Sequence, residues 1–444
     1  MAAVTSGRRS WEAFAVGIVL AVGLVGCTPS SDSGGDGPRV EASGSGSSVV
    51  PGVTSTMIAA MPATTYGGVP LGTQPCYVAL PEKWRQRVEG GRLWSDVMSL
   101  SPGAPTPDGT GVFMSSAFGE APSRFSIEGS GQQVVEELGS VDNPTGQGQY
   151  TYVSIDADHV VFAYEFTIGD QSTDQWAIYA GDRHTGVLTE IARNPVDADG
   201  VALPSAWVRP VLAHDYVYWV QATPDRVPRG SNELMQYAFA TGQTRVIYRG
   251  LALGYVPFGS MILYGAATPN DPSAATPVGW SKVVEAADQA TGLPVPAPAG
   301  LDFVQDHPDS VTTDGDMVVW STPKLELRAW RAAWGRSITL VPRIWWSDQK
   351  LGVNAVDDPQ LYGHFLIWRG GWVLDLTTNS FASLTKLNVS QGPTVAGDWL
   401  AWWDLGPGAS NPPPPGGNPY TQYLINLKGL PDLPDCSQAV LPSP

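Results

Sequence analysis

The chain has 444 residues, of which 43% are hydrophobic and only 15% charged, with 50 glycines, 39 prolines and 17 tryptophans. This turn-rich composition favours many short strands over long helices, and a repeat fold of this length can form one domain. The formal net charge of -17 describes an acidic surface that repels nucleic acids, so no nucleic-acid partner is expected.

The first segment has the layout of an export signal. Arg8 and Arg9 are followed by an uncharged apolar stretch at residues 13–26, which is too short for a comfortable membrane span. It ends in Leu-Val-Gly-Cys at residues 24–27, which resembles the lipobox of bacterial lipoproteins. The resemblance implies cleavage of a signal peptide before Cys27 and a lipid on the thiol of that residue. An ordinary signal peptide with a chance cysteine, or an uncleaved anchor, would be the alternatives.

Serine, glycine, threonine and proline dominate residues 27–60, which is the composition of a flexible tether. With the lipid on Cys27, this predicts a protein anchored to a cell membrane and facing its extracytoplasmic side. Residues 61–110 are expected to pack on or close the folded domain, which is expected at residues 111–444. Within the first of these segments, the early Pro and Glu and later Arg of residues 81–88 predict a short helix.

Two further cysteines, Cys76 and Cys436, lie near the two ends of the folded part. Outside the cytoplasm an even pair of cysteines usually forms a disulfide. Closing a loop of roughly 360 residues would stabilise the fold by a few kcal/mol in the loop-entropy model. Two buried free thiols are the alternative.

One sequence unit recurs after residue 111: a short apolar run, a turn with Asp or Gly, and a second apolar run ending in aromatic residues. Clear copies lie at residues 393–403, 311–320 and 211–219. Several units carry a later pair of strands around an Asp/Thr/Gly turn, as at residues 182–186. The second runs start near Val112, Val160, Tyr216, Met261, Met317, Phe365 and Trp399, and intervals of roughly 34 to 56 residues with several strands each are typical of a β-propeller.

This order of turns resembles bacterial propellers of the TolB-like type, whose blades place an Asp/Gly turn between the first two strands and an Asp-Thr-Gly turn late in the blade. The resemblance covers roughly residue 112 to the C-terminus. It implies an all-β fold, a β-propeller. The seven starts indicate seven blades, although six or eight remain open. Two β-sandwiches are the other fold with many alternating strands. Because a propeller must close on itself, Cys76 and Cys436 are well placed to clasp the chain ends.

No catalytic constellation is recognisable in the sequence. It contains no Gly-x-Ser-x-Gly elbow and no phosphate-binding loop with Lys. Its paired aspartates, such as Asp156 with Asp158, coincide with turns, and its five histidines lack metal-ligand spacing. His159, His214 and His364 occupy equivalent turns. We therefore expect no catalytic residue, no cofactor and no metal.

A basic stretch with several tryptophans interrupts the acidic background. Residues 324–343 contain five Lys or Arg residues against one Glu. Arginine and indole together suit the face of a sugar, an acidic glycan or a protein hot spot. In the alternative, the Trp residues fill the gap between blades and the Arg residues face water. The candidate ligand-binding residues are Arg328, Trp330, Arg331, Trp334 and Arg336.

Together these features predict a membrane-anchored β-propeller lipoprotein that acts as a binding or scaffold module for an envelope protein or a cell-wall glycan. The alternative is a propeller enzyme, a hydrolase or lyase acting on envelope carbohydrate. Such an enzyme would need carboxylates that converge at the mouth of the central channel. A purely structural envelope component is a third hypothesis.

Overall fold

The computed structural model describes a folded part of the chain that lies within one compact unit, residues 63–444. The predicted signal peptide, the tether up to residue 60 and Cys27 lie outside the described residues. No helix in the described part is long and apolar enough to cross a membrane. The described residues are 64–95, 103–115, 121–143, 148–166, 175–197, 200, 203, 208–223, 232–270, 280–306, 310–342, 358–385, 390–405 and 420–439.

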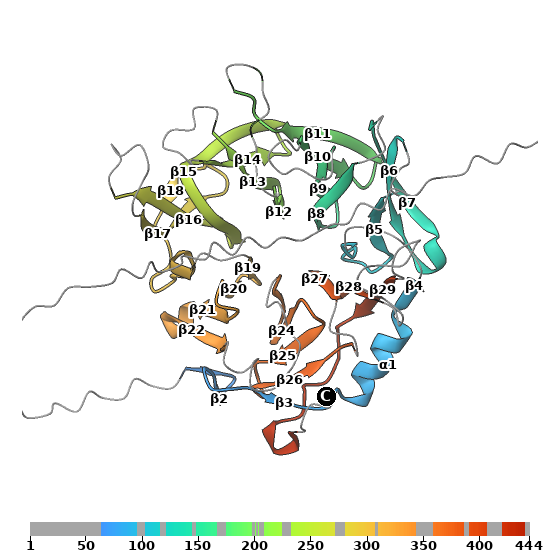
Figure 1. Cartoon of the computed structure of the whole chain (residues 1–444), viewed down its shortest axis with the longest axis vertical. Coiled ribbons are helices and arrows are strands. Elements are labelled where there is room, and N and C mark those ends of the chain that lie inside the picture. Colours follow the sequence, from blue (N-terminus) through green and yellow to red (C-terminus); the bar gives the residue numbers. More distant parts are fainter. Residues whose placement is uncertain are drawn as a thin grey trace, which may run out of the picture. The chain divides into compact units, whose positions relative to one another are not determined.

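These residues are mostly β and form small sheets that follow one another in chain order, which we number as groups of strands (Figure 1). Group 1 contains β5 (Val112–Ser115), β6 (Ser123–Glu128) and β7 (Val134–Val141). Group 2 contains β8 (Gln149–Ile155), β9 (His159–Glu165), β10 (Trp176–Asp182) and β11 (Val187–Arg193).

The next sheet is longer because its strand β15 is shared. The first half of β15 (Gln243–Phe258) pairs with β14 and its second half with β16, so seven strands form two successive groups. Group 3 contains β12 (Val211–Ala213), β13 (Tyr216–Ala222), β14 (Asn232–Ala238) and the first half of β15. Group 4 contains the second half of β15, β16 (Met261–Pro269), β17 (Trp280–Asp288) and β18 (Pro294–Val295).

Three groups complete the series, and the last two take strands from the N-terminal segment. Group 5 contains β19 (Val311–Thr313), β20 (Met317–Ser321), β21 (Leu327–Arg331) and β22 (Arg336–Val341). Group 6 contains β23 (Gln360–Tyr362), β24 (Phe365–Trp368), β25 (Trp372–Asp375), β26 (Ser380–Ser383) and β3 (Cys76–Tyr77). Group 7 contains β27 (Ser390–Ala396), β28 (Trp399–Leu405), β29 (Tyr420–Asn426) and β4 (Arg92–Ser95).

The strands begin where the sequence predicts. The predicted second runs correspond to β5, β9, β13, β16, β20, β24 and β28, and each starts within one residue of the predicted position. In group 1 an isolated bridge between Pro105 and Val112 precedes β5, so that β5 is the second strand there as well. The predicted short helix is α1 (Glu82–Gly90). A small hairpin of β1 (Thr65–Tyr66) and β2 (Val69–Pro70) precedes it.

The second strand of several groups is buried on both faces, as the runs of buried residues in β9, β20 and β24 show, since successive side chains of a strand point in opposite directions. In β20, Met317 and Val319 belong to the cluster of buried apolar residues shared with group 6. Val318 and Trp320 belong to the cluster shared with group 4. A strand covered on both sides requires a continuous apolar run, which explains the Met-Val-Val-Trp sequence.

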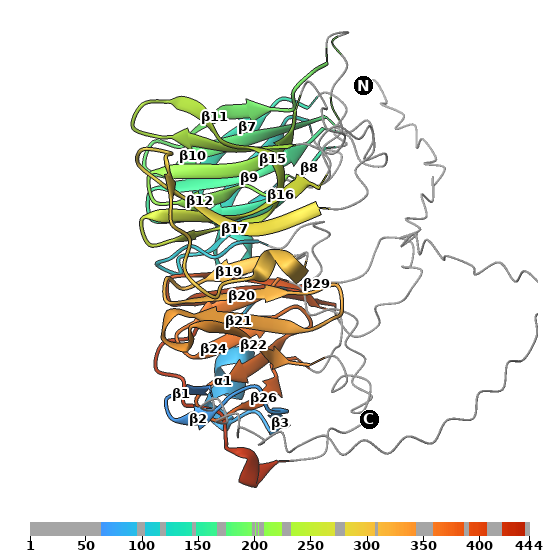
Figure 2. The ribbon, with the colours of Figure 1, turned by 90° about the vertical axis from the view of Figure 1, so that its left-hand side faces the viewer.

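The clusters of buried side chains join the groups in a cyclic order. Six of them join consecutive groups from 1–2 to 6–7. The seventh contains Val112 and Met114 of group 1 together with Ala401 and Trp403 of group 7. Strands of consecutive groups are in contact, for example β7 with β11, β8 with β12 and β19 with β23, and the side view shows the strands running in layers across the molecule (Figure 2). In the described part, every group therefore packs against two others, and the last packs against the first.

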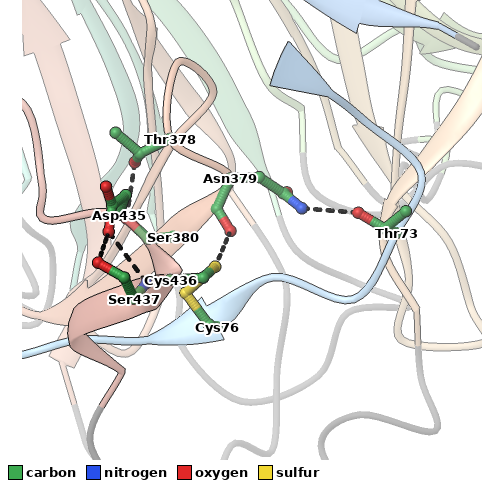
Figure 3. Close-up of a disulfide and its surroundings, with 8 residues drawn as sticks. All are labelled: Thr73, Cys76, Thr378, Asn379, Ser380, Asp435, Cys436 and Ser437. Carbon is green, nitrogen blue, oxygen red and sulfur yellow. Dashed lines mark hydrogen bonds between the residues drawn. A yellow bond between two sulfur atoms is a disulfide. The ribbon is translucent and has the colours of Figure 1, made fainter.

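The two ends of the chain meet on groups 6 and 7. Strand β4 pairs antiparallel with β29, and β3 pairs parallel with β26. The predicted disulfide between Cys76 and Cys436 is present in the structure (Figure 3). Beside it, the side-chain amide of Asn379 donates a hydrogen bond of 2.8 Å to the hydroxyl of Thr73. Two strands from before the repeats thus complete the last two groups, and the disulfide ties the segment after the repeats to one of them.

Candidate binding site at the turns between first and second strands

In groups 2 to 7 a tight turn joins the first strand to the second, and an Asp side chain closes two of these turns. The Oδ1 atom of Asp156 accepts hydrogen bonds from the backbone N–H groups of Asp158 (2.8 Å) and His159 (2.7 Å). The Oδ1 atom of Asp314 accepts the equivalent bonds from Asp316 and Met317. The first Asp of each pair is thus a turn former, as the sequence predicts.

Turns from four consecutive groups enclose a depression of about 400 Å³. Its polar lining includes Asp156 from group 2, His214 from group 3 and Asp314 from group 5, and group 4 contributes Gly259. His214 has a φ of 52°, a left-handed conformation that is uncommon for a residue with a side chain. The sequence indicates that these turns are equivalent, but it gives no sign that they converge on one depression.

The depression is acidic, because Asp156 and Asp314 line it and none of its lining residues is a Lys or Arg. Asp156 and Asp314 each use Oδ1 to close a turn, and an ionised carboxylate has a second oxygen that can accept further hydrogen bonds. The hydroxyl of Ser154 accepts a hydrogen bond from the backbone N–H of Leu212. The lining thus offers carboxylate acceptors and an imidazole to a ligand that donates hydrogen bonds or carries positive charge.

A polar layer lies a few residues before these turns, on the first strands or just ahead of them. The guanidinium of Arg209 lies 3.2 Å from a carboxylate oxygen of Asp358 and 5.0 Å from the ring centre of Tyr152. The hydroxyl of Tyr255 donates to the backbone carbonyl of Arg209. At about 3.3 Å per residue, this layer lies roughly 7–10 Å along the strands from the depression. It therefore forms a floor that joins groups 2, 3, 4 and 6.

Two residues of this floor have left-handed backbone conformations. The φ angle is 48° at Tyr152 and 51° at Asp358. Each costs about 1 kcal/mol or more for a residue with a side chain, and such residues cluster at functional sites. Burial raises the pKa of the Tyr152 hydroxyl, and Arg209 partly offsets this effect. Tyr152 therefore stays neutral at neutral pH, and the charge of Arg209 is met by Asp358.

Two of the five residues predicted to bind a ligand are engaged inside the fold. Trp330 is only 2% exposed, and its indole N–H donates a bond of 3.1 Å to the carbonyl of Ala299. The Arg328 guanidinium lies over the Trp320 ring and 3.7 Å from a carboxylate oxygen of Asp302. For Trp330 the structure matches the alternative in which tryptophans fill the space between groups.

The other three predicted residues, Arg331, Trp334 and Arg336, meet at residues 64–66. The Arg331 guanidinium lies 4.9 Å from the ring centre of Tyr66 and pairs with Asp316. The Trp334 indole N–H donates to the carbonyl of Thr65 at 3.1 Å, and Arg336 donates to the hydroxyl of Thr64 at 2.8 Å. The basic stretch therefore holds the chain's own N-terminal segment. Its role in binding an external ligand stays a prediction.

One group of three potential metal ligands occurs in the described part, at His364, Asp375 and Asp432. The Nε2 atom of His364 lies 2.9 Å from Asp432 and 3.9 Å from Asp375. Asp375 is fully buried and accepts hydrogen bonds from the backbone N–H groups of Thr377 and Leu433, each at 2.8 Å. These contacts hold the C-terminal segment on group 6 and explain the cluster as a structural one.

Comparisons with known proteins give structural neighbours only. No protein-family model matches the sequence, and no curated protein matches it. A prolyl endopeptidase matches with a TM-score of 0.43 and 12% identity, over 79% of this chain and 51% of that one. TolB from Acinetobacter baumannii matches with a TM-score of 0.32 and 18% identity, over 54% and 53%. BamB from Moraxella catarrhalis matches with a TM-score of 0.37 and 13% identity, over 78% and 90%.

The chain spans about half the length of the first two of these structures. Similarity at this level assigns neither a family nor an activity. The functional argument therefore depends on the residues of this chain.

Proposed function

We propose that the described part is a seven-bladed β-propeller in which each group is one blade. The seven clusters of buried side chains support this, because they join the groups in a closed cycle. The pairing of β4 with β29 supports it too, because a strand from the N-terminal segment completes the last blade. In this architecture the turns around Asp156 and Asp314 lie at one mouth of the central channel.

We further propose that the protein is a lipoprotein anchored through Cys27 on the extracytoplasmic side of a membrane, where it binds an envelope protein at this mouth. The observation that carries the binding proposal is the acidic depression. Asp156 and Asp314, from two different blades, line it, and no Lys or Arg does. In a protein with a net charge of -17, such a site favours a partner segment that presents Lys or Arg.

The test is capture of partners from a membrane extract by the purified folded domain, followed by quantitative mass spectrometry. In the variant Asp156→Asn/Asp314→Asn, the Asn side chain keeps an oxygen for the turn but removes the charge. We expect the double variant to capture at least tenfold less of the partner than the wild type. We also expect added salt to weaken capture by the wild type more than capture by the variant. Asp142→Asn, an exposed change in group 1, serves as the control. Equal capture by wild type and the double variant would exclude this mouth as the binding site.

The anchoring proposal has its own test. Cells that express the full chain or Cys27→Ala are labelled with an alkyne analogue of palmitate and fractionated. We expect label and membrane association for the wild type only. A wild-type protein that carries no acyl chain would contradict the lipoprotein assignment and leave the fold assignment intact.

A propeller enzyme acting on envelope carbohydrate is the second candidate function. The observation in its favour is that two carboxylates from different groups, Asp156 and Asp314, line one depression. Hydrolysis or elimination would then depend on both residues. Release of reducing ends or unsaturated products from envelope polysaccharide, abolished by either Asp→Asn change, would support the enzyme over the binding module.

A further inference from the structure

A second hollow lies between α1 and group 7. Its charged lining residues are basic, whereas those of the depression at the turns are acidic. It measures about 440 Å³. Lys83, Gln86 and Arg87 of α1 line one side, and Trp399 and Asn426 of group 7 line the other. The three helix residues fall on one face, because positions three and four apart are neighbours on a helix surface. We call this hollow the α1 groove.

The opposite side of α1 fixes the helix in place. Trp84 is fully buried, its indole N–H donates to the carbonyl of Pro431 at 2.8 Å, and its ring meets that of Phe365 edge to face at 5.1 Å. The groove-lining side chains are anchored as well. The Lys83 amine donates to the carbonyl of Gly429 at 2.7 Å, and Arg87 donates to the carbonyl of Asn426 at 3.0 Å. The groove is therefore preformed.

These two cations keep donors for a ligand. An ammonium group has three N–H donors and a guanidinium has five, and the structure shows one bond from each side chain to a backbone carbonyl. Asn426 accepts a bond from the backbone N–H of Lys428 through its side-chain oxygen, which leaves its amide hydrogens for another acceptor. No Asp or Glu is among the residues that line the groove. In a chain with a net charge of -17, this is a local site for an anion.

Trp399 adds a flat apolar wall. Gly109 packs so closely on its indole that a Cβ at that position would come within 1.9 Å of the ring. This contact fixes the ring of Trp399, which is also one of the residues that line the groove. An indole face suits the C–H surface of a sugar ring, and few conformations are lost on binding because the ring is already held.

The groove also contains hydrogen-bond acceptors. Gly90 and Gly91, at the C-terminus of α1, are part of its lining, and the carbonyl of Gly91 already accepts a bond of 2.8 Å from the backbone N–H of Leu424. Carbonyl groups at a helix C-terminus carry partial negative charge and favour donors over anions. Inorganic phosphate would use the cations but not these carbonyls or the indole. A ligand with a carboxylate and several hydroxyl groups would use all three.

We propose that the α1 groove binds an acidic saccharide, with Lys83 and Arg87 at the carboxylate, Trp399 under a sugar ring, and Gln86 and Asn426 at hydroxyl groups. This site is separate from the proposed protein-binding mouth, and it does not depend on the function proposed for that mouth.

The experiment uses the folded domain and a hyaluronan tetrasaccharide, with the neutral sugar tetra-N-acetylchitotetraose for comparison, in titration calorimetry at low salt. We expect the acidic sugar to bind and the neutral sugar to bind at least tenfold more weakly. Arg87→Gln and Gln86→Leu should each weaken binding of the acidic sugar about tenfold or more. Gln86→Leu keeps a good helix former, so its folding is not at risk.

The matched control is Arg85→Gln, which removes the same charge from the same helix. Arg85 pairs with Glu82 and does not line the groove, so its loss should change the affinity less than twofold. If Arg85→Gln and Arg87→Gln lowered the affinity for the acidic sugar equally, binding would depend only on general charge attraction. That result would overturn the proposal. Competition by inorganic phosphate alone, or by an acidic peptide but not by the sugar, would also overturn it.

Discussion

Arg209 and Asp358 form an ion pair of 3.2 Å between group 3 and group 6. No cluster of buried apolar residues in the described part of the chain joins these two groups directly. The contact therefore connects groups that are not neighbours in the series, and it supports the proposal that the groups surround a common axis.

Loss of this pair should destabilise the fold only slightly. The side chains of Arg209 and Asp358 are 34% and 27% exposed, so solvent screens their attraction. We expect Arg209→Met and Asp358→Asn each to lower the free energy of unfolding by about 1 kcal/mol or less. The double variant should lose less than the sum, because the two residues share one interaction. Urea unfolding measures all three, and strict additivity would show that the pair is not coupled.

The disulfide should contribute more than any surface interaction. Cys76 and Cys436 lie 360 positions apart, and the disulfide joins β3 of group 6 to the segment that follows β29. We expect Cys76→Ser/Cys436→Ser to lower the free energy of unfolding by about 2–5 kcal/mol. Urea unfolding of the wild type with a reducing agent should reproduce the loss. A reductant that leaves wild-type stability unchanged would contradict this expectation.

Trp84 should be critical for the attachment of α1. Its side chain is fully buried against Phe365 and bonded to the carbonyl of Pro431. We expect Trp84→Ala to cost about 3–5 kcal/mol, because it leaves a large cavity. Trp84→Phe should cost less, since it keeps the aromatic contact and loses only the hydrogen bond and part of the volume. Thermal unfolding gives the order of the variants, and an equal loss for both would contradict the cavity explanation.

The Asp-Thr-Gly turns should make stability depend on acid pH. The backbone N–H and the hydroxyl of Thr291 hold the pKa of Asp288 below its usual value of 3.8. A carboxylate whose pKa is lower in the folded state stabilises the fold above 3.8, and this effect is lost as pH falls through the folded pKa. Asp288→Ala should therefore be less stable than wild type at pH 7, and the difference should shrink below pH 3.8. Chemical unfolding across pH 2–7 tests this.

Asp182 offers an independent copy of the same experiment, because the backbone N–H of Thr185 likewise lowers its pKa. Asp142→Ala, in which an exposed carboxylate is removed from group 1, is the control. A stability difference for Asp288→Ala that stays constant at acid pH would mean that the turn does not depend on the carboxylate charge.

The sequence predicts features that local patterns determine. Apolar runs next to Asp or Gly turns locate the strand starts, and an early Pro and Glu with later Arg locate α1. The disulfide also follows from counting, since one pair of cysteines remains after Cys27. These features depend on residues close together in the chain, or on a pairing with a single solution.

Apart from the disulfide, contacts between distant segments were not predictable from the sequence. Nothing local shows that β15 serves two groups, or that Tyr152 and Arg209 form a floor beneath the turns. The basic stretch around Trp334 illustrates the difficulty. Arginines and an indole bind an external ligand and the chain's own Thr65 through the same chemistry, so the sequence alone does not distinguish the two partners.

The sharing of group 7 by β4 and β29 has a consequence for how the protein is made. The ribosome synthesises β4 early and β29 near the end, so an emerging chain carries an unpaired sheet edge through most of its translation. A polypeptide truncated before residue 420 would keep that edge open, and open edges invite aggregation and proteolysis. A chain is therefore protected against aggregation and proteolysis at this edge only once its synthesis is complete.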